Sequence, residues 1–310
     1  MNIPSIKNFL IILLFINISY ISIAHTHDHL PNIPGDISKL DLCPKEPDNW
    51  TSEREFEHVL ILIDKTSWLE AEQIEWISDT IFSEKFVKKY RPYTRFSVLF
   101  INDKSPQLQE YIYSGCRPKM GKKSNAYDDE IHSKNEIKAV VKKWYQRFLN
   151  GDDDIDGWLK VKNKLGTTID ADSSYIFETF IRALKDPSLD FGSDEYTKRK
   201  VIIVSDLMQH SKEFSFYRIC NATTNLKQMN KCPTFDSALK KNDKLQTYLN
   251  MTKPKDVVGL SVELKFLNFK HEANEEIYTS LVNLWKDYFK HIGLEMPSDN
   301  LEWTDWQLNF

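Results

Sequence analysis

Two short apolar segments of this chain each lead into an aspartate, and this pattern constrains the fold more than any other feature. Residues 58–63 (HVLILI) precede Asp64, and residues 201–204 (VIIV) precede Ser205 and Asp206. Apolar runs of this length are typical of buried strands in a parallel sheet. In an open α/β sheet, functional groups gather at the carboxyl ends of the strands, where the order of connection reverses. We therefore expect both carboxylates at one edge of a sheet.

Strand and helix patterns alternate along the chain, which is typical of an α/β protein. The expected strands cover residues 58–63, 96–101, 200–205 and 257–266. Apolar residues at helical spacing predict helices over residues 68–90, 134–149, 174–185 and 277–291. Residues 103–131 are expected to be loop-like, with one short helix near 106–113. We predict a three-layer α/β/α arrangement around a mostly parallel sheet.

The first residues of the chain have the pattern of a secretory signal. Lys7 is followed by the apolar residues 9–16 and then by Ser22-Ile23-Ala24, so a signal peptide is predicted over residues 1–24. Residues 25–55 are polar and contain several prolines, and we expect an N-terminal arm there. Residues 56–310 form the predicted domain, with an insertion over residues 207–254. No second candidate transmembrane segment follows.

This pattern predicts export to the periplasm; the alternatives are a secreted protein, or one anchored by an uncleaved N-terminus. An exported chain meets oxidising conditions, so the four cysteines are expected to form disulfides. Four cysteines allow three pairings. We favour Cys220–Cys232, which closes a short loop within the insertion, and Cys43–Cys116. The spacings contain no Cys-x-x-Cys motif, which argues against a zinc site.

Charge and motif content exclude several classes of function. The formal net charge is -4, whereas a nucleic-acid partner usually requires a concentrated basic face. The chain has no Gly-x-Ser-x-Gly elbow, no Gly-x-Gly-x-x-Gly fingerprint and no Walker lysine motif. With only nine glycines, a phosphate-cradling loop is not favoured. These observations leave a binding protein or an enzyme that uses the two aspartates.

The segment around Asp64 resembles a known protein family. Asp64-Lys65-Thr66-Ser67 follows a strand and precedes a helix, like the first segment of a von Willebrand factor A domain, which carries Asp-x-Ser-x-Ser. In that Rossmann-type family, a second loop adds a Thr or Ser and a third loop adds an Asp, which together form a metal-ion-dependent adhesion site. Asp206 matches the third-loop aspartate, whereas Trp68 replaces the last serine. The resemblance covers about residues 56–293, and residues 205–211 also resemble small bacterial proteins of this fold with no assigned activity.

The resemblance implies an exported protein-binding module rather than an enzyme. Its metal would be Mg²⁺ or another divalent cation, held by oxygen ligands and completed by an acidic residue of a protein partner. The second-loop hydroxyl is open between Thr168, Ser173 and Ser174. The expected metal ligands are Asp64, Thr66, Ser173, Ser174 and Asp206.

Three other interpretations of the two aspartates remain open. In the first interpretation no metal is bound, Asp64 caps the following helix, and Asp206 caps a loop. Alternatively, the two aspartates would serve a metal-dependent hydrolase or phosphatase; the haloacid-dehalogenase pattern, however, requires a second Asp where Thr66 stands. In the third interpretation the protein is a structural subunit of an envelope assembly, with a vestigial site.

Two further patterns contain residue types that bind metals. Asp152-x-Asp154-x-Asp156-Gly157 resembles the start of a calcium loop, but Asn163 stands where a bidentate Glu is needed, so a solvated acidic turn is the favoured alternative. Cleavage after Ala24 would expose His25-Thr26-His27, whose terminal amine, amides and imidazole suit Cu²⁺ or Ni²⁺. The favoured alternative there is a simple polar start of the mature chain.

Overall fold

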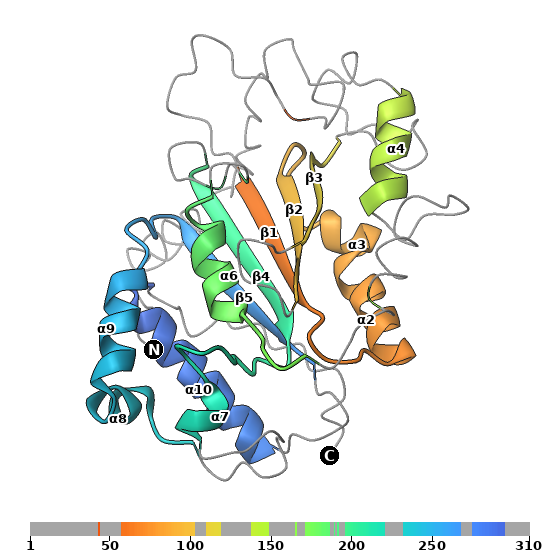
Figure 1. Cartoon of the computed structure of the whole chain (residues 1–310). Helices are drawn as coiled ribbons and strands as arrows, with labels where there is room; N and C mark the ends of the chain where they lie inside the picture. Colours follow the sequence, from red (N-terminus) through yellow and green to blue (C-terminus); the bar gives the residue numbers. More distant parts are fainter. Residues whose placement is uncertain are drawn as a thin grey trace, which may run out of the picture. The chain divides into compact units, whose positions relative to one another are not determined.

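A computed structural model describes residues 43, 57–102, 110–118, 138–148, 165, 171–186, 189, 191, 196–220, 232–267 and 275–294. All of them belong to the unit Pro34–Phe310, and the predicted signal peptide lies outside the described residues. The strands are β1 (Glu57–Asp64), β2 (Arg95–Ile101), β3 (Glu110–Cys116), β4 (Lys198–Ser205) and β5 (Leu260–Phe266) (Figure 1). The helices are α2 (Ala71–Ile81), α3 (Glu84–Val87), α4 (Lys138–Phe148), α6 (Ile176–Ala183), α7 (Phe216–Ile219), α8 (Phe235–Lys240), α9 (Asp243–Thr252) and α10 (Glu275–His291).

The strands form a five-stranded sheet in the order β3-β2-β1-β4-β5. β1 pairs in parallel with β2 and β4, and β4 pairs in parallel with β5, whereas β3 is antiparallel to β2. The mixed α/β class and the mostly parallel sheet are therefore confirmed. The chain first builds outward from β1 through β2 to β3, and then returns to place β4 on the other side of β1. The order of connection thus reverses between β1 and β4, which is where open α/β sheets place their functional groups.

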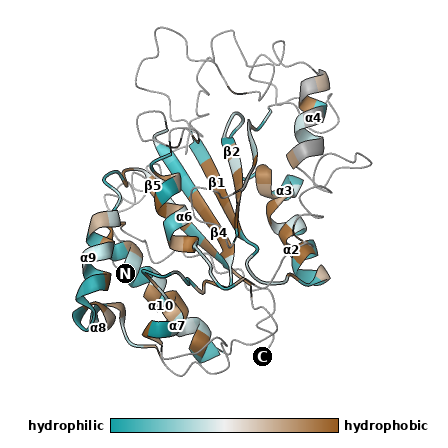
Figure 2. Ribbon diagram, in the orientation of Figure 1, coloured by the Kyte–Doolittle hydropathy of each residue, from teal (hydrophilic) through white to brown (hydrophobic). Residues whose placement is uncertain are grey.

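The inner strands are buried along their length, because they are apolar on both faces. Val59 to Ile63 of β1 and Val201 to Val204 of β4 are all fully buried. Figure 2 shows the hydrophobic colour concentrated on these two strands. Leu60 and Leu62 belong to a large apolar cluster that also contains Phe180 of α6. Burial on both faces explains why these strands are continuous apolar runs rather than alternating ones.

Aromatic side chains hold α3 and α4 near β2. The ring of Phe96 in β2 lies 6.2 Å from that of Phe86 in α3, between centroids. It lies 6.4 Å from Trp144 and 5.0 Å from Phe148, both in α4. The Phe96–Trp144 pair is edge-to-face and the other two pairs are tilted, and such aromatic pairs add to the free energy of burial.

Two expected elements differ from the structure. The helix expected over residues 68–90 is two helices, because α2 ends at Ile81 and Ser83 caps α3 by accepting a hydrogen bond from Phe86 N at 3.2 Å. The short helix expected near residues 106–113 is wrong where the structure describes it, since residues 110–116 form β3. The segment Tyr111-Ile112-Tyr113 has strand-favouring side chains, and the edge of β2 offers it a hydrogen-bonding partner.

The insertion over residues 207–254 has more order than its polar composition suggests. It contains α7, α8 and α9, and it buries Phe235, Leu245 and Leu249. The disulfides Cys220–Cys232 and Cys43–Cys116 are both formed, as expected. Within the described part of the chain, we find no helix of the length and apolar character that crossing a membrane would require.

Candidate functional site

Asp64 is the last residue of β1, and its carboxylate is fully buried and fully hydrogen-bonded. Oδ1 accepts hydrogen bonds from Thr66 N at 2.9 Å and from Thr66 Oγ1 at 2.7 Å. Oδ2 accepts from Ser174 Oγ at 3.0 Å and from Ser205 Oγ at 2.7 Å. A carboxylate has about four lone-pair sites, so these four donors satisfy it. The donors come from three segments that are far apart in the sequence.

Ser205, rather than Asp206, is the residue of β4 that faces Asp64. The β1–β4 register pairs Ile63 with Val204, so Asp64 lies beside Ser205 at the ends of the two strands. The single hydroxyl proton of Ser205 goes to Asp64, because the contact to Asp206 Oδ1 is longer, at 3.4 Å. Ser205 Oγ also accepts a hydrogen bond from Leu207 N at 2.8 Å. The hydroxyl therefore links Asp64 to the backbone of the turn after β4.

Asp206 begins a tight turn after β4, and its side chain is almost fully buried. Its Oδ1 accepts a hydrogen bond from Met208 N at 2.9 Å, which closes the turn. Leu207 has a φ of 61°, a left-handed conformation that is costly for a branched side chain. The indole Nε1 of Trp285 in α10 donates to the carbonyl of Leu207 at 3.0 Å and holds it in place. The strand-end turn is thus strained and braced from α10.

The second loop reaches the site through Ser174. Ser174 exchanges two backbone hydrogen bonds with His210, at 2.8 and 2.9 Å. The amide of Ala171 donates to the carbonyl of Thr66 at 2.9 Å and ties this loop to the one after β1. Ser173 is half-buried, and the described side chain of this loop that bonds Asp64 is Ser174. Thr168, the third candidate, lies outside the described residues.

Burial and hydrogen bonding shift the pKa of the Asp64 carboxyl in opposite directions. Loss of solvent raises the pKa of the Asp64 carboxyl, while the bonds from Thr66, Ser205 and Ser174 oppose that rise. None of the described lysines and arginines forms an ion pair with Asp64. The neighbouring Lys65 ammonium instead lies 5.3 Å from the ring centroid of Phe100. Asp64 is therefore a buried acid without a compensating cation among the described residues, a costly arrangement when it is ionised.

The donor set fits a hard divalent cation in chemical type. It combines two carboxylates, Asp64 and Asp206, with the hydroxyls of Thr66, Ser174 and Ser205, and Mg²⁺ prefers such oxygen ligands. Where the structure describes side chains, no three His, Cys, Asp or Glu residues gather in a metal-binding group. Any cation here would therefore depend on hydroxyls and water. Each hydroxyl would have to turn its proton away from Asp64 and offer a lone pair to the ion.

Trp68 exposes a large apolar side chain two residues after Thr66. It stands four residues after Asp64, where the adhesion-site pattern has a hydroxyl, and its side chain is 54% exposed. Tryptophan is enriched at the centres of protein interfaces.

A partly buried polar cluster adjoins the site and was not anticipated. Gln209, three residues after Asp206, donates from Nε2 to Glu178 Oε2 at 2.9 Å and accepts from Phe177 N at 2.7 Å. The Tyr248 hydroxyl of α9 donates to Glu178 Oε1 at 3.2 Å. Burial raises the pKa of Glu178, and the hydrogen bonds it accepts lower it in part. The cluster joins α6, the turn after β4 and the insertion.

The structure brings together most of the expected site residues. Asp64, Thr66, Ser174 and Asp206 meet at the ends of β1 and β4, as the parallel-strand argument predicts. Ser205 was missed as a ligand candidate. Its place at the end of an apolar run was visible in the sequence, but the register that sets it beside Asp64 appears only in the structure. The hypothesis that Asp64 caps the next helix is wrong, because α2 begins after Glu70, whereas Asp206 does close a turn, as the capping interpretation expects. The calcium-loop pattern at residues 152–157 and the histidines at 25–29 lie outside the described residues.

Comparison with known proteins adds no assignment. A scan against protein-family models finds none that matches the chain, and a search of curated proteins finds no similar sequence.

Proposed function

We propose that this protein is an exported protein-binding module of the von Willebrand factor A type, with a three-layer α/β/α arrangement and a binding face at the carboxyl ends of β1 and β4. The strand order supports the proposal, since the reversal between β1 and β4 coincides with the convergence of Asp64 and Asp206. Fold analogy alone supports function only by association, so the proposal depends on the site. The two disulfides are consistent with an oxidising compartment, and we propose the periplasm.

The observation that matters most is the buried carboxylate of Asp64, which has no cationic partner among the described residues. The charge of such a group is removed by protonation, stabilised by hydrogen bonds alone, or balanced by a cation. We propose that Mg²⁺ or a similar divalent cation balances it, held by Asp64, Thr66, Ser174, Ser205 and Asp206, with Ser173 close enough in sequence to contribute. Mg²⁺ keeps several waters when it binds protein, and one of these would give way to an acidic side chain of the partner.

Trp68 would supply the apolar part of the same binding face. Protein interfaces obtain most of their affinity from a few central aromatic or arginine residues, surrounded by groups that exclude water. An exposed tryptophan next to an ion that captures a carboxylate is such an arrangement. Trp68, which replaces the serine of the family pattern, would then contact the partner directly.

The enzymatic alternative is less well supported by the geometry. A nucleophilic carboxylate must present an oxygen to its substrate, whereas Asp64 is 0% exposed and both of its oxygens accept two hydrogen bonds. The structural-subunit alternative predicts that substitution of Asp64 leaves the interaction with any partner unchanged.

The cation is tested by thermal unfolding in EDTA and then in Mg²⁺, Mn²⁺ or Ca²⁺. A ligand that binds only the folded state stabilises it by about 2.7 kcal/mol at a hundred times its Kd. We expect a metal-dependent rise in Tm for the wild type that is lost in Asp64→Asn. The matched control is Asp79→Asn, an exposed aspartate on α2, which should keep the rise. No rise in the wild type, or an equal rise in Asp64→Asn, would refute the ion site.

Partner binding is tested by immobilising the wild type and each of three variants, and by comparing the partner proteins that each retains. We expect a partner protein retained by the wild type to be lost from Asp64→Asn and from Trp68→Ala. Val258→Ala removes an exposed apolar side chain elsewhere and should retain the partner. Tm values must stay close to that of the wild type for Trp68→Ala and Val258→Ala. If both site variants retain every partner, the binding face lies elsewhere.

A further inference from the structure

The insertion forms a half-open cavity that the strand-end site does not use. Its volume is about 640 Å³, within the range of small-molecule sites. One wall is the segment from Glu213 to Ile219, which includes α7, and the other runs from Cys232 to Leu245 through α8 and the start of α9. Both walls are joined by the Cys220–Cys232 disulfide. The cavity is therefore fixed by a covalent link as well as by packing.

The floor of the cavity is apolar. Phe214, Cys232, Ala238 and Leu245 line it, and all four are buried. An apolar surface of this kind gains free energy when a ligand covers it, in proportion to the area removed from water.

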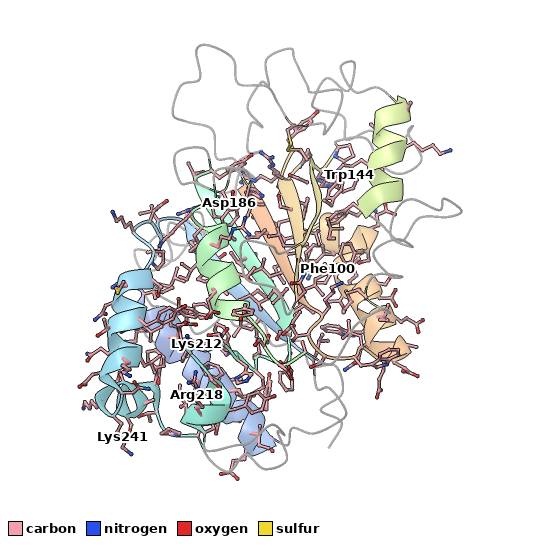
Figure 3. All side chains as sticks on the ribbon, in the orientation of Figure 1. Phe100, Trp144, Asp186, Lys212, Arg218 and Lys241 are labelled. Carbon is pink, nitrogen blue, oxygen red and sulfur yellow. A yellow bond between two sulfur atoms is a disulfide. The ribbon has the colours of Figure 1, made fainter. Side chains whose placement is uncertain are left out.

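Two cations lie on opposite walls of the cavity. Arg218 belongs to α7 and Lys241 follows α8, and both line the cavity and are exposed (Figure 3). The Arg218 Nη2 donates to the carbonyls of Ser211 at 2.8 Å and Lys212 at 2.6 Å, which holds the guanidinium in one orientation. Among the described residues, neither cation has an acidic partner within ion-pair distance. A pre-positioned guanidinium loses little entropy when it binds an anion.

The other polar groups of the lining are already engaged, with one exception. Thr234 and Asn242 accept hydrogen bonds from the backbone of α8 and α9, at 3.3 and 3.0 Å. Ser215 Oγ is bonded to His210 Nδ1 at 2.8 Å. The exception is Glu213, which is exposed, so the described residues of the lining carry two positive charges and one negative charge.

We propose that this cavity binds a small apolar carboxylate, with its hydrocarbon body on Phe214, Ala238 and Leu245 and its carboxylate between Arg218 and Lys241. The apolar floor selects the body of the ligand, and the two cations select its charge. Glu213 weakens the binding of the anion by repulsion and would favour an ammonium ligand if it dominated. This inference is independent of the protein-binding function proposed above.

The test uses the full chain and a matched series of probes. The probe is 3-phenylpropionate, and its neutral counterpart is 3-phenylpropanamide, which has the same shape. Binding is followed by calorimetry and by saturation-transfer NMR. We expect the carboxylate to bind with a Kd of about 1 mM or tighter, as its size allows, and the amide to bind about tenfold more weakly. High salt should weaken binding of the carboxylate but not that of the amide.

Four variants locate the site. Lys241→Gln and Arg218→Gln are each expected to weaken carboxylate binding by about fivefold to tenfold, because each removes a charge-assisted contact. Lys240→Gln removes an adjacent exposed cation of α8 that does not line the cavity, and it should bind like the wild type. Glu213→Gln should tighten binding a few-fold by removing repulsion. Arg218 also donates hydrogen bonds to the backbone, so Arg218→Gln can perturb the fold. In that case the effect of Lys241→Gln on carboxylate binding decides whether the cavity is the site.

Three results with the probes would overturn the proposal. These are equal binding of carboxylate and amide, preferential binding of 3-phenylpropylamine, and the absence of binding at about 10 mM probe, well above the expected Kd. Loss of binding in Lys240→Gln equal to that in Lys241→Gln would also overturn it, because the effect would then be one of net charge rather than of the cavity.

Discussion

Ser205 shows how a single hydroxyl organises the strand-end site. It donates to Asp64, accepts from Leu207 N, and lies next to Asp206 in both sequence and space. A neutral donor does not remove the negative charge of Asp64, but it stabilises that charge in a place where water is excluded. The residue thus supports both the acid and the strained turn that follows it.

Removal of this hydroxyl should destabilise the protein. Ser205→Ala leaves a buried carboxylate short of one donor and Leu207 N without its acceptor, at an expected cost of about 1–3 kcal/mol. Ser173→Ala, at a half-buried serine of the neighbouring loop, should change stability by less than about 0.5 kcal/mol. Urea unfolding in EDTA measures both. Equal losses would mean that the Ser205 contact does not contribute.

The raised pKa of Asp64 predicts a pH dependence with a definite sign. In the unfolded chain an aspartate titrates near pH 4, and burial raises the pKa of Asp64 in the folded protein. The folded state therefore binds the proton more tightly. The resulting contribution to stability is present below the unfolded pKa and is lost as the pH rises through the folded pKa.

Comparison with Asp64→Asn isolates this contribution, because the other titrating groups, including Glu57 and Glu178, are the same in both proteins. In EDTA, the stability of the wild type minus that of Asp64→Asn should be greatest near about pH 4 and should fall toward neutral pH. A bound cation favours the ionised form, so added Mg²⁺ should reverse the fall. Urea unfolding at a series of pH values measures the difference, and a constant difference would contradict the shift.

At the scale of elements, the cluster around half-buried Glu178 connects three parts of the fold. Glu178 lies in α6, Gln209 follows the strand-end turn, and Tyr248 lies in α9 of the insertion. The insertion is therefore attached to α6 by hydrogen bonds to a half-buried acid as well as by apolar packing. Burial and the nearby charge of Glu178 both raise the pKa of the Tyr248 hydroxyl, so it remains a proton donor.

Tyr248→Phe removes one hydrogen-bond donor from the half-buried carboxyl of Glu178. We expect a loss of about 1–2 kcal/mol in unfolding free energy, since the carboxyl keeps its burial but loses a hydrogen bond. The pKa of Glu178 should rise further for the same reason. Tyr175→Phe, at a half-buried tyrosine just before α6, is the matched control and should lie within about 0.5 kcal/mol of the wild type. If the control loses as much, the effect is not specific to the cluster.

At the scale of the whole molecule, two covalent links close loops of very different length. Cys43–Cys116 joins residues 73 positions apart, whereas Cys220–Cys232 joins residues 12 positions apart. A cross-link lowers the entropy of the unfolded chain more when the loop it closes is longer. The longer link should therefore contribute more to stability.

Paired Cys→Ser substitutions test this order. Chain-entropy reasoning predicts a loss of about 4 kcal/mol for Cys43 and Cys116 together, and of about 3 kcal/mol for Cys220 and Cys232. Urea unfolding under non-reducing conditions compares the two double variants. A larger loss of unfolding free energy in the Cys220/Cys232 variant would contradict this order. It would show that the Cys220–Cys232 disulfide acts by stabilising the folded insertion, rather than by restricting the unfolded chain.

Local pattern was sufficient to predict the strands of the parallel part of the sheet. The apolar runs that precede Asp64 and Ser205 reflect burial on both faces of the sheet. This burial can be predicted from the residues of each strand alone. The convergence of Asp64 and Asp206 followed from strand direction alone. β3 was not predicted, because an edge strand of mixed polarity takes its structure from the partner it pairs with.

The sequence by itself therefore determined the class of fold, the edge where the acids meet and the residues available to form disulfides. Only the tertiary structure decided that Ser205 faces Asp64, that Gln209 and Tyr248 meet Glu178, and that the insertion forms a cavity. The physical reason is that burial leaves a signal within each element, as a continuous apolar run in an inner strand or as a periodic apolar face on a helix. Contacts between side chains distant in sequence depend instead on strand register and helix packing, which no single segment encodes.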